Sequence, residues 1–365
     1  MTTYGSLGID VMQTSSGASL GAGDASIMKN RIINGAMVSD QRNNGGSFSV
    51  STLSYFAGYS YTVDRWNAFC SVVSKFTVQQ NAGSVTSPVG FSNYLGCTSS
   101  SAYSIAAGDY FGIGQRIEGF NTSDLGWGTA NAKTVTLSFE VYSSLTGNFG
   151  GAFTNSAGNR SYPFTYSIPV ANTWTPISIT VPGDTTGAWA ATTGTGIQLT
   201  FGLGVGSTYS GAAGSWSSNL YMSSTGATSV VGTNGATFYI TGVQLEVGSF
   251  ATGFEYRQYQ QELALCQRYY QMTTDVWSNY NYMFGATIGA NYGLKACIFP
   301  VTMRASPTVV SYSESGTANA FSINRGGAYS AGYLSIPSGF TLTNGTGGNI
   351  TVTELTFKWT ASAEL

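Results

Sequence analysis

The stretch KTVTLSFEVYSS, Lys133–Ser144, decides the fold class, because apolar side chains alternate along it with Thr, Ser and Glu. Successive side chains of a strand point to opposite faces of a sheet, so this alternation predicts a strand with one buried and one polar face. The same alternation recurs in SKFTVQQ (Ser74–Gln80), TPISITVP (Thr175–Pro182), GIQLTFGLGVG (Gly196–Gly206) and ATFYITGVQLEVG (Ala236–Gly248). No convincing helical period interrupts residues 30–253, which therefore predict an all-β jelly roll or β-sandwich.

The composition excludes several classes of protein. Only 8% of the 365 residues are charged, against about 25% in an ordinary globular protein, and the net charge is -2. A nucleic-acid binder needs a basic surface, which this chain lacks. The chain has no histidine, so catalytic triads and metal sites that need an imidazole are excluded. A hydrophobic content of 42% argues against disorder.

Residues 254–272 change the period from two to that of a helix. Five apolar or aromatic residues follow one another at spacings of three, four, three and four: Tyr256, Tyr259, Leu263, Cys266 and Tyr270. Such spacing predicts one apolar seam along a connector helix. The seam either packs on the edge of the sandwich or meets copies of itself at an oligomer axis. Two heptads are too short to decide between these alternatives.

The strand pattern returns from residue 273 and continues to Leu365. The stretch ITVTELTFKWTASAEL, Ile350–Leu365, alternates cleanly and predicts a strand tied into a sheet. We expect a second, smaller β-sandwich over residues 273–365, a length within the normal range for a domain.

The N-terminal 29 residues are rich in Gly and Ser and carry only scattered apolar side chains. We interpret residues 1–29 as an arm that docks on a partner, with a loose terminus as the alternative. The stretch lacks the basic and apolar regions of a signal peptide. No apolar run reaches the roughly 18 residues that a membrane span requires, so we expect synthesis in a cytosol and no membrane insertion.

Four cysteines are present: Cys70, Cys97, Cys266 and Cys297. Their spacing contains no CxxC pair and no cluster, so we expect four small buried side chains. A disulfide between Cys70 and Cys97 remains an open alternative.

Three stretches resemble the tail-fibre and related virion-fibre proteins of bacteriophages. The first is KNRIINGAMVSDQRN (Lys29–Asn43) with YTVDRW (Tyr61–Trp66), and the second is FYITGVQLEVGSFATGFEYRQYQQELALCQRYYQ (Phe238–Gln271). The third is FPVTMRASPTVV (Phe299–Val310) with the terminal FKWTASAEL. The resemblance covers nearly the whole chain after Lys29, and its motifs are structural rather than catalytic.

The resemblance implies a jelly roll similar to carbohydrate-binding modules, followed by a connector and a C-terminal sandwich. It also implies a homotrimer in the virion that binds a bacterial surface glycan or protein, with the arm attached to other virion proteins. Fibres of this kind often have a long N-terminal shaft, which this sequence lacks. We therefore expect a compact tail fibre, with a head fibre, decoration protein or baseplate scaffold as the alternative.

The adjacent Asp64, Arg65 and Trp66 stand out in a chain with so few charges. We interpret them as an ion pair that fixes the first strand, with Glu246 as the expected partner of Arg65. A contact between these residues and a sugar is the minority alternative.

Candidate glycan-binding residues come from loops that combine aromatic and polar side chains, since sugars bind aromatic faces and planar polar groups. One such loop is GQRIEGFNTSDLGWG, residues 114–128. The candidates are Arg116, Glu118, Asp124, Trp127, Trp189, Tyr209 and Trp216. Glu118 and Asp124 are also the best pair for glycoside hydrolysis, although Arg116 could neutralise Glu118. Packing and capping remain the alternative for all seven.

We expect no catalytic residue, no cofactor and no metal site, because the carboxylates are scattered singly and no stretch has EF-hand spacing. The glycines of Phe201–Trp216 are followed by no Lys and do not form a phosphate loop. The sequence therefore favours a non-enzymatic, glycan-binding adhesin of a virion. A depolymerase that cleaves surface polysaccharide is the less favoured reading.

Overall fold

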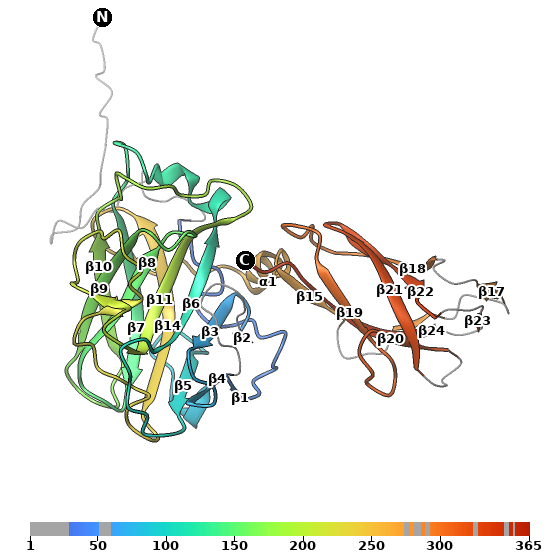
Figure 1. Cartoon of the computed structure of the whole chain (residues 1–365), viewed down its shortest axis with the longest axis horizontal. Coiled ribbons are helices and arrows are strands. Elements are labelled where there is room, and N and C mark those ends of the chain that lie inside the picture. Colours follow the sequence, from blue (N-terminus) through green and yellow to red (C-terminus); the bar gives the residue numbers. More distant parts are fainter. Residues whose placement is uncertain are drawn as a thin grey trace, which may run out of the picture.

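The computed structural model describes residues 29–50, 60–273, 278–280, 286–288, 293–323, 328–346, 350–352 and 355–365. Residues 1–28 of the expected arm lie outside this part of the chain, so the arm remains a prediction. The described chain forms two bodies of β-structure with a short helix between them (Figure 1).

The first body is a sandwich of two six-stranded antiparallel sheets. One sheet has the order β1 (Phe48–Ser49), β4 (Phe76–Gln80), β5 (Leu95–Ser99), β14 (Thr237–Val247), β7 (Val135–Ser143) and β10 (Thr175–Val181). The other has the order β2 (Ser60–Tyr61), β3 (Trp66–Cys70), β6 (Tyr110–Glu118), β11 (Thr195–Val205), β8 (Gly147–Thr154) and β9 (Ser161–Ile168). The short pair β12 (Ser210–Gly211) and β13 (Ser223–Ser224) lies outside both sheets, and the short 3₁₀ helices are η1 (Ala82–Ser84), η2 (Gly119–Asn121) and η3 (Ser123–Leu125).

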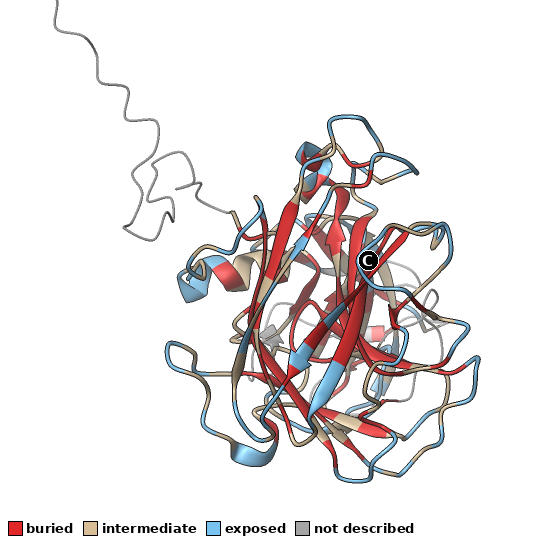
Figure 2. Cartoon of the chain, turned by 90° about the vertical axis from the view of Figure 1, so that its left-hand side faces the viewer, coloured by how far each residue is buried: buried red, intermediate tan, exposed pale blue. Residues whose placement is uncertain are grey.

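The core of this sandwich lies between the two sheets and is rich in aromatic side chains. On β7, Leu137, Phe139 and Val141 point into it, so the intervening Ser138 and Glu140 face outward. Figure 2 shows the buried residues concentrated on the strands and the exposed residues in the loops. The alternation of residues 133–144 therefore predicted both the strand and its buried face.

The second body is a smaller sandwich around its own apolar core. Its main sheet has the order β15 (Tyr270–Met272), β24 (Leu355–Ser362), β20 (Ala320–Ile323), β21 (Ala328–Ile336), β22 (Gly339–Asn344) and β18 (Gly293–Ile298). Two further strands, β16 (Ser278–Tyr280) and β19 (Thr308–Tyr312), also pair with β24, and β17 (Ala286–Ile288) pairs with β23 (Ile350–Val352). The predicted all-β architecture of two sandwiches with a connector helix is confirmed.

The connector helix is shorter than its sequence pattern predicted. Helix α1 spans Tyr259–Gln267 and not residues 254–272. Tyr256 precedes it, and Tyr270 belongs to β15, where it pairs with Ser362 of β24. Pairing with the C-terminal strand thus overrides the local helical period. Cys266 is buried beside Ile33 and Tyr269 of the same chain, so the expected single seam of five residues does not form.

All four cysteines are free and buried. The expectation of four small buried side chains is confirmed, and the alternative of a Cys70–Cys97 disulfide is wrong. Burial raises the pKa of the Cys70 thiol to about 11, so this thiol stays protonated at neutral pH.

Arg65 joins the two sandwiches and does not pair with Glu246 as the sequence suggested. Its guanidinium forms an ion pair with Glu364, donates 2.7 Å to the carbonyl oxygen of Arg116, and lies 3.5 Å from the centre of the Tyr269 ring. Glu246 instead bonds to Thr252 and lies 3.8 Å from Lys29. The prediction placed the partner of Arg65 on the last strand of the first sandwich. Residues 363–365 instead fold back beside α1 (Figure 1) and bring Glu364 to Arg65.

Other arginines complete this joint, which we call the C-terminal clasp: Arg42, Arg65, Arg116 and Arg304 around residues 363–365. Arg42 bonds to Glu364 at 2.8 Å, and Arg116 donates to the Leu365 carbonyl oxygen at 2.9 Å. Arg304 donates 2.6 Å bonds to the carbonyl oxygens of residues 363 and 364 and a 2.9 Å bond to that of residue 193. The clasp therefore binds the end of β24 to the loops of the first sandwich.

Replacing Arg65 with Met should lower the free energy of unfolding by about 3 kcal/mol, because it leaves Glu364 buried beside fewer positive charges. Urea denaturation followed by circular dichroism measures the effect. The control is Asp124→Asn, which breaks the more exposed Arg31–Asp124 pair and should cost no more than about 1 kcal/mol. Equal effects of the two substitutions would show that the clasp does not stabilise the fold.

Candidate functional site

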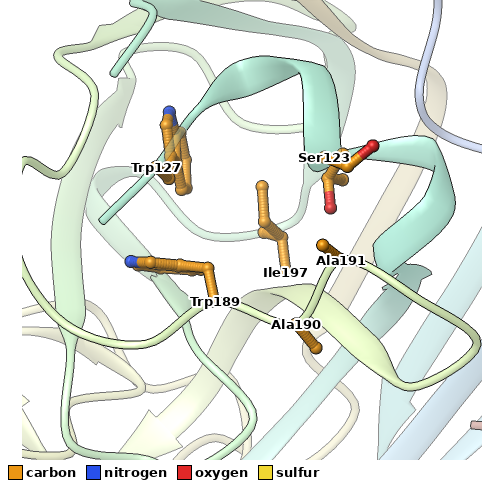
Figure 3. A pocket seen from close by; sticks show the side chains of 7 residues that line it. Ser123, Trp127, Trp189, Ala190, Ala191 and Ile197 are labelled. Carbon is orange, nitrogen blue, oxygen red and sulfur yellow. The ribbon is translucent and has the colours of Figure 1, made fainter. Parts of the chain in front are cut away.

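Three of the predicted glycan-binding aromatics meet at one end of the first sandwich. Trp127, Trp189 and Trp216 pack edge to face, with ring centres 4.8 to 5.5 Å apart. Figure 3 shows the indole rings of Trp127 and Trp189 beside a hollow whose other sides carry Ser123, Ala190, Ala191 and Ile197. The sequence therefore identified residues that do come together.

The polar groups of this tryptophan cluster are already hydrogen-bonded within the protein. The indole N–H groups of Trp127 and Trp216 donate 2.8 Å bonds to backbone carbonyl oxygens, and that of Trp189 donates to Asp184 and a neighbouring carbonyl oxygen. Asp184 also receives two bonds from Arg160, at 2.7 and 2.6 Å. The hollow measures only about 50 Å³, well below the roughly 300 Å³ at which ligand pockets begin. The cluster closes the end of the core.

The predicted acidic pair does not form a catalytic arrangement. Glu118 is buried and receives bonds from Arg268 at 2.9 and 2.6 Å and from the Tyr269 hydroxyl at 2.7 Å. Burial would raise the pKa of Glu118, but these donors outweigh burial and lower it. The cation that pairs with Glu118 is Arg268, which the sequence did not indicate.

The remaining two candidates lie elsewhere. Asp124 is 45% exposed and forms an ion pair with Arg31 at 2.7 Å. Tyr209 packs edge to face on Tyr110, in a separate small cluster with Met222. Among the described residues, no contact joins Asp124 or Tyr209 to the tryptophan rings.

A larger cavity lies on the outer face of the sheet that contains β14, β7 and β10, and we call it the sheet pocket. Its volume is about 320 Å³, within the range of small-molecule sites. Its lining residues are Phe91, Ser138, Phe139, Glu140, Pro176, Ile177, Ser178, Gly242, Ala251, Thr252, Phe254 and Tyr256.

Three aromatic rings form one wall of the sheet pocket. Phe91 lies 5.1 Å from Phe254 and 5.6 Å from Tyr256, and the latter two rings are 4.9 Å apart. Tyr256 is 61% exposed, so its ring remains open to solvent. Rings arranged in this way offer a ligand apolar faces with a negative quadrupole.

A bulge in β14 makes room for this wall. The register against β7 shifts between Thr241 and Gln244, and Gly242 within the shift has a φ of +62°. A Cβ atom at Gly242 would lie 2.6 Å from the Phe91 ring, so only glycine lets that ring lie on the strand. The backbone therefore shapes the floor of the pocket.

Glu140 lies on the floor, opposite Pro176 of β10 and Thr241 of β14. Its side chain is half-buried and has no hydrogen bond or ion pair with any described residue. Burial raises the pKa of this carboxyl group. Among the described carboxylates, only Glu314 of the second sandwich shares this lack of a partner.

Sequence reasoning missed the sheet pocket. The sequence signal for it was that Glu140 is the one acid among the outward-facing polar residues of 133–144 and has no neighbouring cation in the sequence. Nothing local connects it with Phe91 or Phe254, which come from distant parts of the chain. Tyr256 was predicted to lie on the apolar seam of the helix, but its ring belongs to the pocket wall. Of the other seam residues, Tyr259 is exposed and Leu263 half-buried.

No group of three or more Cys, Asp or Glu side chains that could hold a metal ion occurs in the described part of the chain. Nor does any helix there have the length and apolar character needed to cross a membrane.

No protein-family model and no curated protein matches the chain. Among solved structures, it is similar to the enzymatically active domain of tailspike protein 4 from bacteriophage CBA120, with 15% identity and a TM-score of 0.33. That likeness covers 60% of this chain and 22% of the tailspike chain, so this chain matches about a fifth of its length.

Two carbohydrate-binding modules are also similar. A family 4 module shares 15% identity over 59% of this chain and 98% of its own, with a TM-score of 0.28. The family 11 module of Clostridium thermocellum was solved with a mixed-linked tetrasaccharide. It shares 12% identity over 56% of this chain and 98% of its own, with a TM-score of 0.27. Likeness at this level concerns the fold alone.

The same substitution should have opposite effects at the two acids. Glu118→Gln removes one partner of a buried pair and should destabilise the protein by about 3 kcal/mol at pH 7. Glu140→Gln removes a half-buried charge without a partner and should raise the unfolding midpoint. Thermal unfolding at a series of pH values measures both.

The pH dependence should differ in sign as well. The folded pKa of Glu118 is lowered, so its contribution is present above the unfolded value of about 4.3 and is lost as the pH falls through the folded pKa. The folded pKa of Glu140 is raised, so the gain in Glu140→Gln should vanish below about pH 4. A destabilised Glu140→Gln protein at pH 7 would mean that Glu140 has a partner after all.

Proposed function

We propose that this chain is a non-enzymatic glycan-binding adhesin and that the sheet pocket holds the sugar. The observation that carries the proposal is the combination, in one cavity of about 320 Å³, of three packed aromatic rings and a carboxylate without a partner. The tryptophan cluster lacks the space for a sugar ring.

The chemistry of the pocket matches that of a pyranose. A sugar ring presents C–H groups on its faces, which pack on aromatic rings, and hydroxyl groups on its edge, which need hydrogen-bond partners. Glu140 accepts such bonds, and Ser138 and Ser178, paired across β7 and β10, both donate and accept. The pocket thus offers an apolar wall and a polar floor to one ligand.

The proposal includes a place on a bacteriophage virion, as a tail fibre that attaches to the host. The resemblance of residues 29–43, 238–271 and 299–310 to virion-fibre proteins supports this part. Residues 1–29 would then bind other virion proteins. Immunogold labelling of intact particles with an antibody to the second sandwich tests the location, and label on the capsid alone would contradict it.

The absence of catalysis also belongs to the proposal. A glycosidase usually needs two carboxyl groups on either side of the scissile bond, and Glu140 is the one carboxylate that lines the sheet pocket. Glu118 is bound by Arg268 and Tyr269. Release of reducing sugar from host polysaccharide by the wild-type chain would contradict this.

Substitution of the pocket wall should weaken glycan binding. We expect Phe254→Ala and Tyr256→Ala each to weaken the best ligand of a glycan array by at least tenfold, about 1.4 kcal/mol, because each removes an aromatic face. Titration calorimetry measures the affinities. Trp189→Phe is the control and should bind as the wild type does; loss of binding in this control alone would move the site to the tryptophan cluster.

We also propose a homotrimer, as the resemblance to virion fibres implies. Light scattering at micromolar concentration should give about three times the chain mass of 38.2 kDa. A monomer at this concentration would rule the trimer out. Because Cys266 and Tyr270 are buried within the chain, Cys266→Ala should change its stability rather than its association.

A further inference from the structure

Glu140 gives the sheet pocket a negative charge that no cation among the described residues balances. No Lys or Arg lines the cavity, and the other titratable group that lines it is the Tyr256 hydroxyl. Next along β7 on the same face lies Tyr142, whose ring stacks on Tyr239. A ligand therefore meets one carboxylate and no competing positive charge.

Behind the pocket wall, the nearby charges are already paired with one another. Thr252 accepts a hydrogen bond from Lys29 and donates to Glu246 at 2.7 Å, and Lys29 and Glu246 lie 3.8 Å apart. This arrangement leaves Lys29 directed at Glu246 and Thr252 rather than at Glu140. The uncompensated charge of the pocket is therefore a property of Glu140 alone.

The aromatic wall adds to the same preference. The faces of Phe91, Phe254 and Tyr256 carry negative quadrupoles, which attract cations that come to rest on them. A carboxylate in a partly desolvated site, together with aromatic faces, favours a ligand that brings a positive charge. A neutral hydroxyl group can bond to Glu140, but it gains nothing from the quadrupoles.

Resting on the proposed function, we propose that the glycan bound in the sheet pocket carries a free, protonated amino group, as in an amino sugar that is not N-acetylated, and that this ammonium group contacts Glu140. Ser138 precedes Glu140 by two residues on β7, a strand rise of about 7 Å, and Ser178 pairs with Ser138. They are placed to bind hydroxyl groups at the other end of the same sugar.

A matched pair of sugars tests the class of ligand. The probes are the trisaccharide of β-1,4-linked glucosamine and its fully N-acetylated counterpart, which differ in the charge of the amino groups. Titration calorimetry with the full chain at pH 6.5 and about 0.15 M salt, where exposed charges are largely screened, should show at least tenfold tighter binding of the glucosamine trisaccharide.

Two variants assign the preference to Glu140. Glu140→Gln should abolish it, while Phe254→Ala should weaken both probes. The control is Glu314→Gln, which removes the other described carboxylate without a partner, outside the pocket, and should retain the preference in full. This control accounts for general attraction between a cationic sugar and an acidic chain. Thermal unfolding checks that each variant is folded.

Three results would overturn the inference without touching the proposed function: equal binding of the two probes, a preference that survives in Glu140→Gln, or binding of other, neutral glycans alone that Phe254→Ala abolishes. The proposed function itself fails if no glycan binds. It also fails if every glycan that binds the wild type binds Phe254→Ala and Tyr256→Ala with the same affinity. The two failures are therefore distinguishable.

Discussion

The guanidinium group of Arg65 lies inside the protein, between the carboxylate of Glu364 and the ring of Tyr269, and both sandwiches meet around it. Burial by itself would lower the pKa of Arg65, but Glu364 together with Tyr269, Tyr61 and Cys266 outweighs burial and raises it. Arg65 also has a φ of +71° in the turn before β3, a strained conformation for a residue with a side chain. The ion pair with Glu364 places the last residues of the chain between the connector helix and the first sandwich.

The same use of charge recurs throughout the described chain. With only 8% charged residues, most carboxylates serve joints between segments: Glu364 in the clasp, Glu118 with Arg268, and Asp184 with Arg160. The surface keeps its polarity through Ser, Thr and Asn instead. Against this background, an acid without a partner that lines a cavity is an exception, and this is why Glu140 marks the sheet pocket as the candidate site.

The strands were predictable because their side-chain period is local. Residues 133–144 predicted strand β7 with its buried face. Residues 236–248 predicted strand β14 but not its burial on both faces. The helix was predicted too long, because the pairing of Tyr270 with Ser362 depends on a strand about 90 residues later. The partner of Arg65 was wrong for the same reason, since Glu364 comes from the far end of the chain.

The candidate site was less predictable than the fold. The three tryptophans were predicted to bind a glycan; the structure brings them together, but their N–H groups are bound to the protein's own carbonyl oxygens and to Asp184. A sequence does not show whether an aromatic cluster is packed or open. The sheet pocket depends on a bulge at Gly242 and on rings from residues 91, 254 and 256, and no local pattern links these positions.

A crystal structure of the chain with its best glycan would test the central claim most directly. The account predicts a sugar ring against Tyr256 and Phe254, with a polar group of the sugar within hydrogen-bonding distance of Glu140. A glycan seated instead beside Trp127 and Trp189, or on the second sandwich, with the sheet pocket empty, would contradict it.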